Sequence, residues 1–338
     1  MSKKWAWRLL PWAVAGGLLL WVAQIIPLDE TWAAFQRLEW AQVGLLVVVN
    51  GLILVLLNGR WWFILRGQGY QVPFFRLLGY RLAGFGVSYF TPGPHFGGEP
   101  LQIYLLEKRH QLPRSTAVAS IALDKSLELW VNFAFLTGGL TAALSGHMLP
   151  NLLEEHFLLL ALGLLAVPTS FLGATWGGYY PLSWLTARLA RWTGWQRWQR
   201  MVILWTWLPD AARRTEAQIA AFCRHQPWML LAAFVVSLLS WLAVVGEYWL
   251  MLHVMGLSLS PLKVITALVV LRLTLLLPLP GGLGGMEAGQ VFVLGLFGQS
   301  QAAALSVGLL IRLRDVLLGL LGLWWGWLVT PIKKTPDR

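Results

Sequence analysis

The segments PGPHFGGE (residues 92–99) and PGGLGGME (residues 280–287) share the pattern P-G-x-x-x-G-x-E. Each copy interrupts an apolar stretch, at about Leu77–Leu106 and at about Leu262–Phe297. Proline ends the incoming helical arm, and the glycines allow a tight reversal. Irregular backbone is tolerated at membrane depth only where protein or a water-filled cavity covers it, so the pattern predicts two re-entrant helical hairpins. The residues expected at the bends and the cavity wall are Pro92, Gly93, Gly97 and Glu99 in the first copy and Pro280, Gly281, Gly285 and Glu287 in the second.

The composition around these segments excludes a soluble protein. Of the 338 residues, 57% are hydrophobic and only 12% are charged, which is typical of an integral membrane protein. The single cysteine cannot form an intramolecular disulfide, and the six scattered histidines offer no metal-ligand spacing. We therefore expect neither a metal nor another cofactor. The net charge of +11 indicates loops that face anionic lipid rather than a nucleic-acid partner.

Six continuous apolar stretches approach or exceed the roughly 20 residues that a membrane-spanning helix needs. They run at about Leu9–Ile26, Ala41–Leu57, Thr116–Ser145, Phe157–Tyr179, Pro227–Met251 and Ala302–Val329. The fold class expected is therefore an all-α polytopic membrane protein with six full spans and two re-entrant hairpins.

The basic residues predict how these spans are oriented. Residues 146–156 contain two glutamates and no Lys or Arg, whereas residues 180–226 contain seven arginines. The positive-inside rule therefore places the second loop in the cytoplasm. The same rule predicts cytoplasmic termini, with the first hairpin entering from the cytoplasm and the second from the external face. The membrane expected is a bacterial cytoplasmic (inner) membrane. The cytoplasmic assignment after the second span rests on Arg60, Arg66, Arg76 and Arg81.

The two hairpins define two halves of opposite orientation, the pattern of an inverted-topology repeat. We expect an N-terminal span and external loop at 1–40, a first repeat at 41–145 and a connecting region at 146–226. A second repeat at 227–330 and a cytoplasmic tail at 331–338 follow. The connecting region contains a span and a segment rich in arginine and tryptophan, which predicts a helix lying at the membrane interface.

Ionisable residues lie within or beside the apolar runs, where they are costly unless they face a cavity or each other. The residue 25 positions after each motif glutamate is charged. It is Asp124 in the first half and Arg312 in the second. One interpretation is purely structural, with Arg312 bound to Asp315 and with Asp124 and Glu128 bound to a neighbouring arginine. The other is a binding site in which the two motif glutamates stabilise helix starts and leave cations for an anionic lipid headgroup. The cations proposed for that site are Arg81, Lys125, Arg272, Arg312 and Arg314.

The segments Pro92–Leu106, Leu123–Lys125 and Leu279–Gly289, with Arg312 downstream, resemble a known family. It is the flippase-like transmembrane family that forms the membrane half of lysylphosphatidylglycerol synthases (MprF) and also occurs as stand-alone YbhN- and AglD-type proteins. The resemblance implies a lipid-handling protein whose hairpins meet at a central cavity with phosphate-binding basic residues. Gln102 and Lys125 stand where relatives often have arginine. Because lysine lacks the bidentate guanidinium fork, the identity of the lipid does not carry over.

Together these features predict a non-enzymatic transporter that flips an anionic lipid, either a phospholipid or a polyprenyl-phosphate-linked lipid, through a headgroup site at the membrane midplane. The alternative is a membrane glycosyl- or phosphotransferase that uses a lipid-phosphate donor, with Asp29 and Glu30 as candidate acids. A third possibility is a binding subunit for a lipid-modifying enzyme. The sequence leaves the oligomeric state open.

Overall fold

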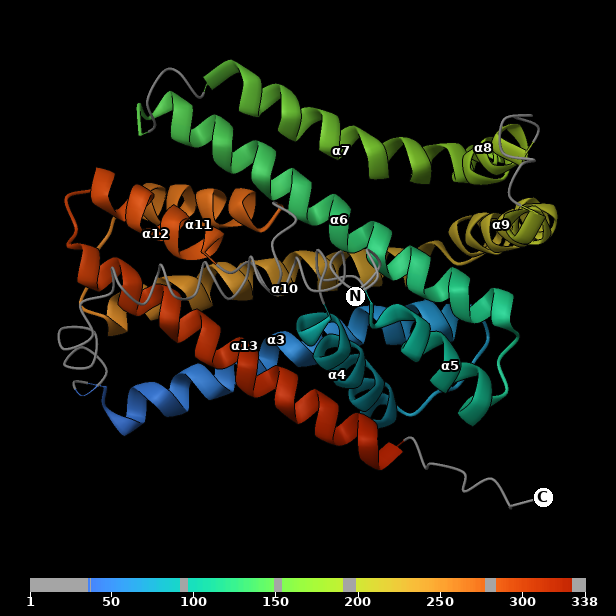
Figure 1. Ribbon diagram of the computed structural model, residues 1–338, viewed down its shortest axis with the longest axis horizontal. Coiled ribbons are helices and arrows are strands. Elements are labelled where there is room, and N and C mark those ends of the chain that lie inside the picture. Colours follow the sequence, from blue (N-terminus) through green and yellow to red (C-terminus); the bar gives the residue numbers. More distant parts are fainter. Residues whose placement is uncertain are drawn as a thin grey trace, which may run out of the picture.

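The computed structural model describes residues 36, 38–91, 97–148, 154–190, 199–276 and 284–329. This part of the chain is entirely helical, without a β-strand (Figure 1). Its helices are α3 (Trp40–Gly67), α4 (Phe74–Phe90), α5 (Glu99–His110), α6 (Arg114–Ser145), α7 (Glu154–Gly177), α8 (Pro181–Ala190), α9 (Gln199–His225), α10 (Pro227–Val254), α11 (Pro261–Leu275), α12 (Gly285–Leu296) and α13 (Gln301–Val329).

Proline marks the start of many of these helices. Pro73 and Pro113 directly precede α4 and α6, whereas Pro100, Pro227 and Pro261 lie in the first turn of α5, α10 and α11. A proline there loses no intrahelical hydrogen bond, because the first N–H groups of a helix have no partner within it. The sequence therefore sets these boundaries locally.

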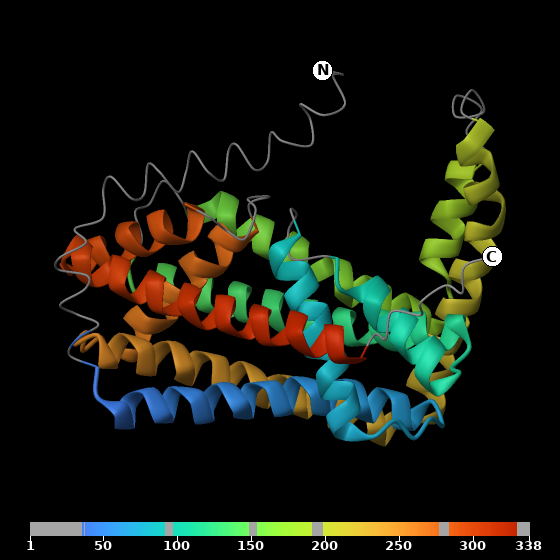
Figure 2. The ribbon, with the colours of Figure 1, turned by 60° about the horizontal axis from the view of Figure 1, so that its bottom comes forward.

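Two four-helix units of the same order dominate the structure. The first is α3–α6 and the second is α10–α13. Their first helices, α3 and α10, run side by side along one edge (Figure 2), and the contacts between the units are otherwise reciprocal. Helix α4 of the first unit packs along α13 of the second, and α11 of the second packs against α6 of the first. In each unit the two short middle helices, α4 with α5 and α11 with α12, also pack against each other.

Glycines allow these helices to approach closely. A Cβ atom at Gly322 of α13 would overlap the carbonyl oxygen of Leu82 in α4, and one at Gly86 would lie 2.6 Å from the carbonyl oxygen of Gly319. Within the first pair of short helices, a Cβ at Gly98 would overlap the backbone of Gly84. Small residues are a common basis of helix packing in membranes, because they let backbones come into contact.

Four helices are long and apolar enough to cross a membrane: α3, α6, the part of α7 from His156 to Gly177, and α10. They confirm a helical integral membrane protein. The last expected span corresponds to α13, which carries three charged residues. The first expected span lies outside the described residues, and so do Pro92, Gly93, Pro280 and Gly281.

One expectation about this region was wrong. Arg60 was assigned to a loop after a span ending near Leu57, but α3 continues to Gly67 and Arg60 is buried within it. The apolar residues Trp61–Leu65 extend the helix beyond the arginine. Arg60 therefore belongs to the interior of the protein, and Arg81 likewise lies within α4.

Two adjacent glycines of α6 provide a test of this packing. A Cβ at Gly139 would lie 2.6 Å from Val269 Cγ2 of α11, whereas a Cβ at Gly138 has no atom within 4 Å. We expect Gly139→Ala to lower the free energy of unfolding by about 1–3 kcal/mol through overpacking. Gly138→Ala should leave it unchanged or raise it, because alanine is the better helix former. Thermal unfolding in detergent measures both, and equal Tm values for the two variants would contradict the α6–α11 contact.

Candidate functional site

Arg60 of α3 is the centre of the first charged cluster. Its Nε donates to Asp124 Oδ1 at 2.6 Å, and its Nη2 donates to Asp124 Oδ2 at 3.2 Å and to Glu128 Oε2 at 2.8 Å. The Arg60 side chain is only 1% exposed. Both carboxylates come from α6, so this single guanidinium group links the first and last helices of the first unit.

Arg81 connects α4 to the same cluster through Asp124. Its Nη2 donates to Asp124 Oδ2 at 2.9 Å, and its guanidinium lies 5.4 Å from the ring centre of Trp61. The Trp61 indole N–H in turn donates to Ser120 Oγ at 3.2 Å. The Nε of Arg81 is buried and has no hydrogen-bond partner. Arg81 is thus held in place through one nitrogen while another donor remains unused.

Glu99 and Lys125 connect the start of α5 to α6. Glu99 Oε2 accepts a hydrogen bond of 3.0 Å from the backbone N–H of Gly97, and Glu99 Oε1 lies 3.8 Å from Lys125 Nζ. Lys125 Nζ also lies 3.2 Å from Glu128 Oε1. A carboxylate in the first turn of a helix stabilises the partial positive charge of the helix N-terminus. This is the structural role considered for Glu99 in the sequence.

The second unit repeats this arrangement. Glu287 Oε2 accepts a hydrogen bond of 2.9 Å from the backbone N–H of Gly284, and Glu287 Oε1 accepts one of 2.7 Å from Arg312 Nε. In both units, therefore, the motif glutamate binds a backbone amide at the helix start and a base on the following long helix. The counterpart of Arg312 is consequently Lys125, one residue beyond the Asp124 that simple counting selected.

The remaining charges of the second unit also join its first and last helices. Arg314 of α13 lies 2.5 Å from Glu247 of α10 and 2.8 Å from Asp315. Arg60 and Glu247 occupy corresponding helices, with the basic and acidic roles exchanged between units. The predicted Arg312–Asp315 pair is not the arrangement found, because Arg312 binds Glu287 and Asp315 binds Arg314. The predicted role of a neighbouring arginine for Asp124 and Glu128 is filled by Arg60.

Arg272 of α11 differs from the other cations. Its guanidinium lies 4.8 Å from the ring centre of Trp241, and its Nε is buried without a hydrogen-bond partner. Among the ion pairs within the described residues, none involves Arg272. The charged groups that act on it electrostatically are Arg314, Asp315 and Glu247 from the second unit and Glu128 from the first. Arg272 therefore lies between the two charged clusters.

A further contact joins the two units at this level. Arg312 of α13 lies close enough to Tyr89 of α4 to act electrostatically on its phenol group, and Gly285 is the first residue of α12, within the turn that Glu287 closes. The predicted charged residues in the described part of the chain thus form two clusters, around Arg60 and around Arg314, and Arg272 interacts electrostatically with both; together these residues are called the charged layer. Sequence reasoning included neither Arg60 nor Glu247 among the site residues. The signal for both was a charge inside a long apolar run.

The match to a family model covers residues 8–322 and is described as the lysylphosphatidylglycerol synthase TM region. The chain belongs to the lysylphosphatidylglycerol synthase transmembrane-region family. The match includes both charged clusters and all helices from α3 to α12. It agrees with the resemblance inferred from the two glycine-rich motifs.

Two curated relatives share part of this family domain. UPF0104 membrane protein MJ1595 of Methanocaldococcus jannaschii is 27% identical over 119 residues, and a UPF0104 membrane protein of Methanothermobacter thermautotrophicus is 30% identical over 112 residues. The matched segments cover 35% and 33% of this chain, and the chain covers only about a third of the length of each relative. No solved structure matches the chain significantly.

The dependence of the first cluster on Arg60 is testable. We expect Arg60→Gln to destabilise the protein by about 3–5 kcal/mol, because it removes the buried cation that Asp124 and Glu128 share and leaves them with Arg81 and Lys125 alone. Adding Asp124→Asn should restore part of the lost stability, since it removes one of the two carboxylates that have lost Arg60 as a partner. Arg66→Gln, an exposed position on the same helix, is the matched control. Unfolding midpoints in detergent that are equal for Arg60→Gln and Arg66→Gln would contradict this role.

Proposed function

We propose that this protein moves an anionic lipid, a phospholipid or a polyprenyl-phosphate-linked lipid, between the leaflets of a bacterial inner membrane. The observation that carries the proposal is Arg272, a cation without an ion pair among the described residues, placed between two otherwise paired clusters. A buried arginine donor without a partner is rare in folded proteins. A lipid phosphate is a chemically fitting partner, because guanidinium groups bind phosphate with two parallel hydrogen bonds.

The reciprocal packing of the two units supports an inverted repeat with six spans. In this proposal, α4–α5 and α11–α12 are the re-entrant hairpins, and both termini are cytoplasmic. Each hairpin contacts the last helix of the opposite unit, α4 on α13 and α11 on α6. Inverted repeats provide alternating access when one unit rocks against the other around a fixed midplane site. Because each hairpin packs against a long helix of the opposite unit that carries charged residues, such a motion would shift those residues relative to one another.

The exposure of the charged residues supports a site that is partly open. The Lys125 and Arg314 side chains are 30% and 26% exposed, whereas the Arg60 side chain is buried. We propose that Arg272 binds the phosphate and that Lys125 and Arg314 contact it from the two sides. Arg81 and Arg312 hold the hairpins in place and line the site. The headgroup then crosses within this polar layer while the acyl chains remain in the surrounding lipid.

The proposal is transport rather than catalysis by this chain. The candidate acids of a transferase, Asp29 and Glu30, lie outside the described residues, and no feature of the described residues favours a transferase. A separate lipid-modifying enzyme is the proposed source or consumer of the lipid. The charged layer itself offers positioned cations, which suit binding and passage of an anion.

The test is lipid flipping by the purified protein in vesicles. Phosphatidylglycerol labelled on one acyl chain is quenched from outside, and the rate of loss of the protected fraction is measured. We expect Arg272→Gln to slow flipping at least about tenfold, the factor that 1.4 kcal/mol of lost binding in the crossing state produces. Arg272→Lys should retain an intermediate rate, because it keeps the charge without the fork.

The control for this test is Arg188→Gln, a change on α8 away from the charged layer. It should flip lipid at the wild-type rate. Folding of all variants is checked by size-exclusion chromatography and Tm. A correctly folded Arg272→Gln protein that flips phosphatidylglycerol at the wild-type rate would refute the proposal.

A further inference from the structure

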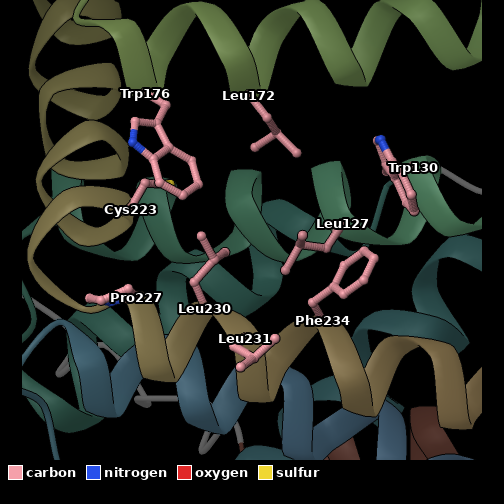
Figure 3. Close-up of a pocket in the computed structure, with 9 residues that line it drawn as sticks. All are labelled: Leu127, Trp130, Leu172, Trp176, Cys223, Pro227, Leu230, Leu231 and Phe234. Atoms are coloured by element: carbon pink, nitrogen blue, oxygen red, sulfur yellow. The ribbon is translucent and has the colours of Figure 1, made fainter.

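A second feature of the molecule is an apolar cavity of about 430 Å³, away from the charged layer. Figure 3 shows α7 along one side and α10 along the other, with α6 behind and α9 at one end. The cavity is lined by Leu127 and Trp130 of α6, Leu172 and Trp176 of α7, Cys223 of α9, and Pro227, Leu230, Leu231 and Phe234 of α10. Apart from the cysteine thiol and the two indole N–H groups, these side chains are hydrocarbon.

This cavity is separate from the charged layer, although α6 contributes to both. At 100° per residue, Leu127 and Trp130 project from a face of α6 different from that of Lys125 and Glu128. Leu127 packs into an apolar cluster with Ile219 of α9 and Ala233 of α10, whereas Glu128 points to Arg60. A ligand in the cavity therefore lies apart from the proposed headgroup site, and its binding does not depend on transport.

The cavity is open at one side. Trp176 and Leu231 are 51% and 48% exposed, and Pro227 is also exposed, whereas Leu127 and Cys223 at the inner wall are buried. Trp130 and Phe234 meet edge to face, with ring centres 5.2 Å apart, and limit the cavity at one end. An elongated apolar ligand can therefore enter laterally and reach the inner wall.

A cation lies directly beside the cavity. Arg224 follows Cys223 on α9, is exposed, and donates from Nε to the carbonyl oxygen of Trp176 at 2.8 Å. Among the ion pairs within the described residues, none involves Arg224. The Nε of Arg224 is held by this hydrogen bond, and its Nη2 and Nη1 lie beside Gly178 at the end of α7, 2.7 Å and 3.8 Å from where a Cβ of residue 178 would be. Arg213 and Arg214 are further exposed cations of the same amphipathic helix, whose arrangement suits a membrane surface.

We propose that this cavity binds one acyl chain of an anionic phospholipid, with the lipid phosphate at Arg224. The volume favours a chain over a partner helix, since a helix about 10 Å wide fills roughly this volume with a single turn of 5.4 Å. The apolar wall matches the chain, and the adjacent guanidinium matches the phosphate. The bound lipid would hold α7, α9 and α10 together.

Photo-crosslinking tests this site directly. The full-length protein in lipid nanodiscs is irradiated with phosphatidylglycerol that carries a diazirine on one acyl chain, and the adducts are mapped by mass spectrometry. We expect adducts concentrated on the cavity residues of α7 and α10. Leu172→Trp should fill the cavity and lower these adducts about fivefold, the change expected when roughly 1 kcal/mol of binding is lost. Leu160→Trp, on an exposed face of α7, should leave them unchanged.

The role of Arg224 is tested with the same probe. Phosphatidylcholine carrying the same diazirine should give about fivefold fewer cavity adducts than phosphatidylglycerol, and Arg224→Gln should abolish this preference. Arg213→Gln, an exposed position on the same helix, should preserve it. Adducts spread equally over the exposed residues of α7 would overturn the cavity site. Equal labelling by the two lipids would overturn the assignment of an anionic ligand.

Cys223 supplies an independent measurement, because it is the only cysteine of the chain. Burial raises the pKa of its thiol to about 11, so alkylation by a maleimide is slow and reports access to the inner wall. Added phosphatidylglycerol should slow the alkylation further in the wild type and have no effect in Leu172→Trp. Alkylation that is insensitive to phosphatidylglycerol in the wild type would overturn the proposal.

Discussion

The structure depends on pairing charges that are placed among apolar helices. Arg60 is buried within α3 and binds two carboxylates of α6, and Arg81 of α4 binds one of them, Asp124. Separating these ion pairs would leave charged side chains in an apolar medium without a partner. The free-energy cost of that is much larger than the stabilisation gained when the pairs form. The charged layer therefore fixes which helices must meet. Apolar packing and glycine contacts then determine how closely they approach.

The two four-helix units pair their interior charges in the same way but with different residues. Each places a glutamate at the start of its second short helix, where the carboxylate binds a backbone amide and a base on the next long helix. Each also pairs its first and last helices through a charge contact, Arg60 with Asp124 and Glu247 with Arg314. Because α4 and α11 are exchanged onto the opposite units, the two clusters become parts of one layer.

Much of this arrangement follows from the sequence. The repeated motif predicted the paired short helices, and the charges within apolar runs predicted Asp124, Glu128, Arg312 and Arg314 as interior residues. The choice of partners did not follow, because it depends on how α3 and α10 pack. Arg60 was assigned to a loop because four arginines without an acid resemble a cytoplasmic segment. The apolar cavity beside Cys223 was also not predictable, since its wall depends on how the side chains of four helices pack against one another.

In the proposed mechanism, the charged layer holds a lipid phosphate at Arg272. The most direct measurement is a cryo-EM structure of the protein in nanodiscs containing phosphatidylglycerol. We expect phosphate density within hydrogen-bonding distance of the Arg272 guanidinium, with Lys125 or Arg314 on its far side. A map in which Arg272 instead forms an ion pair with a carboxylate of the protein, and in which no headgroup density enters the layer, would contradict it.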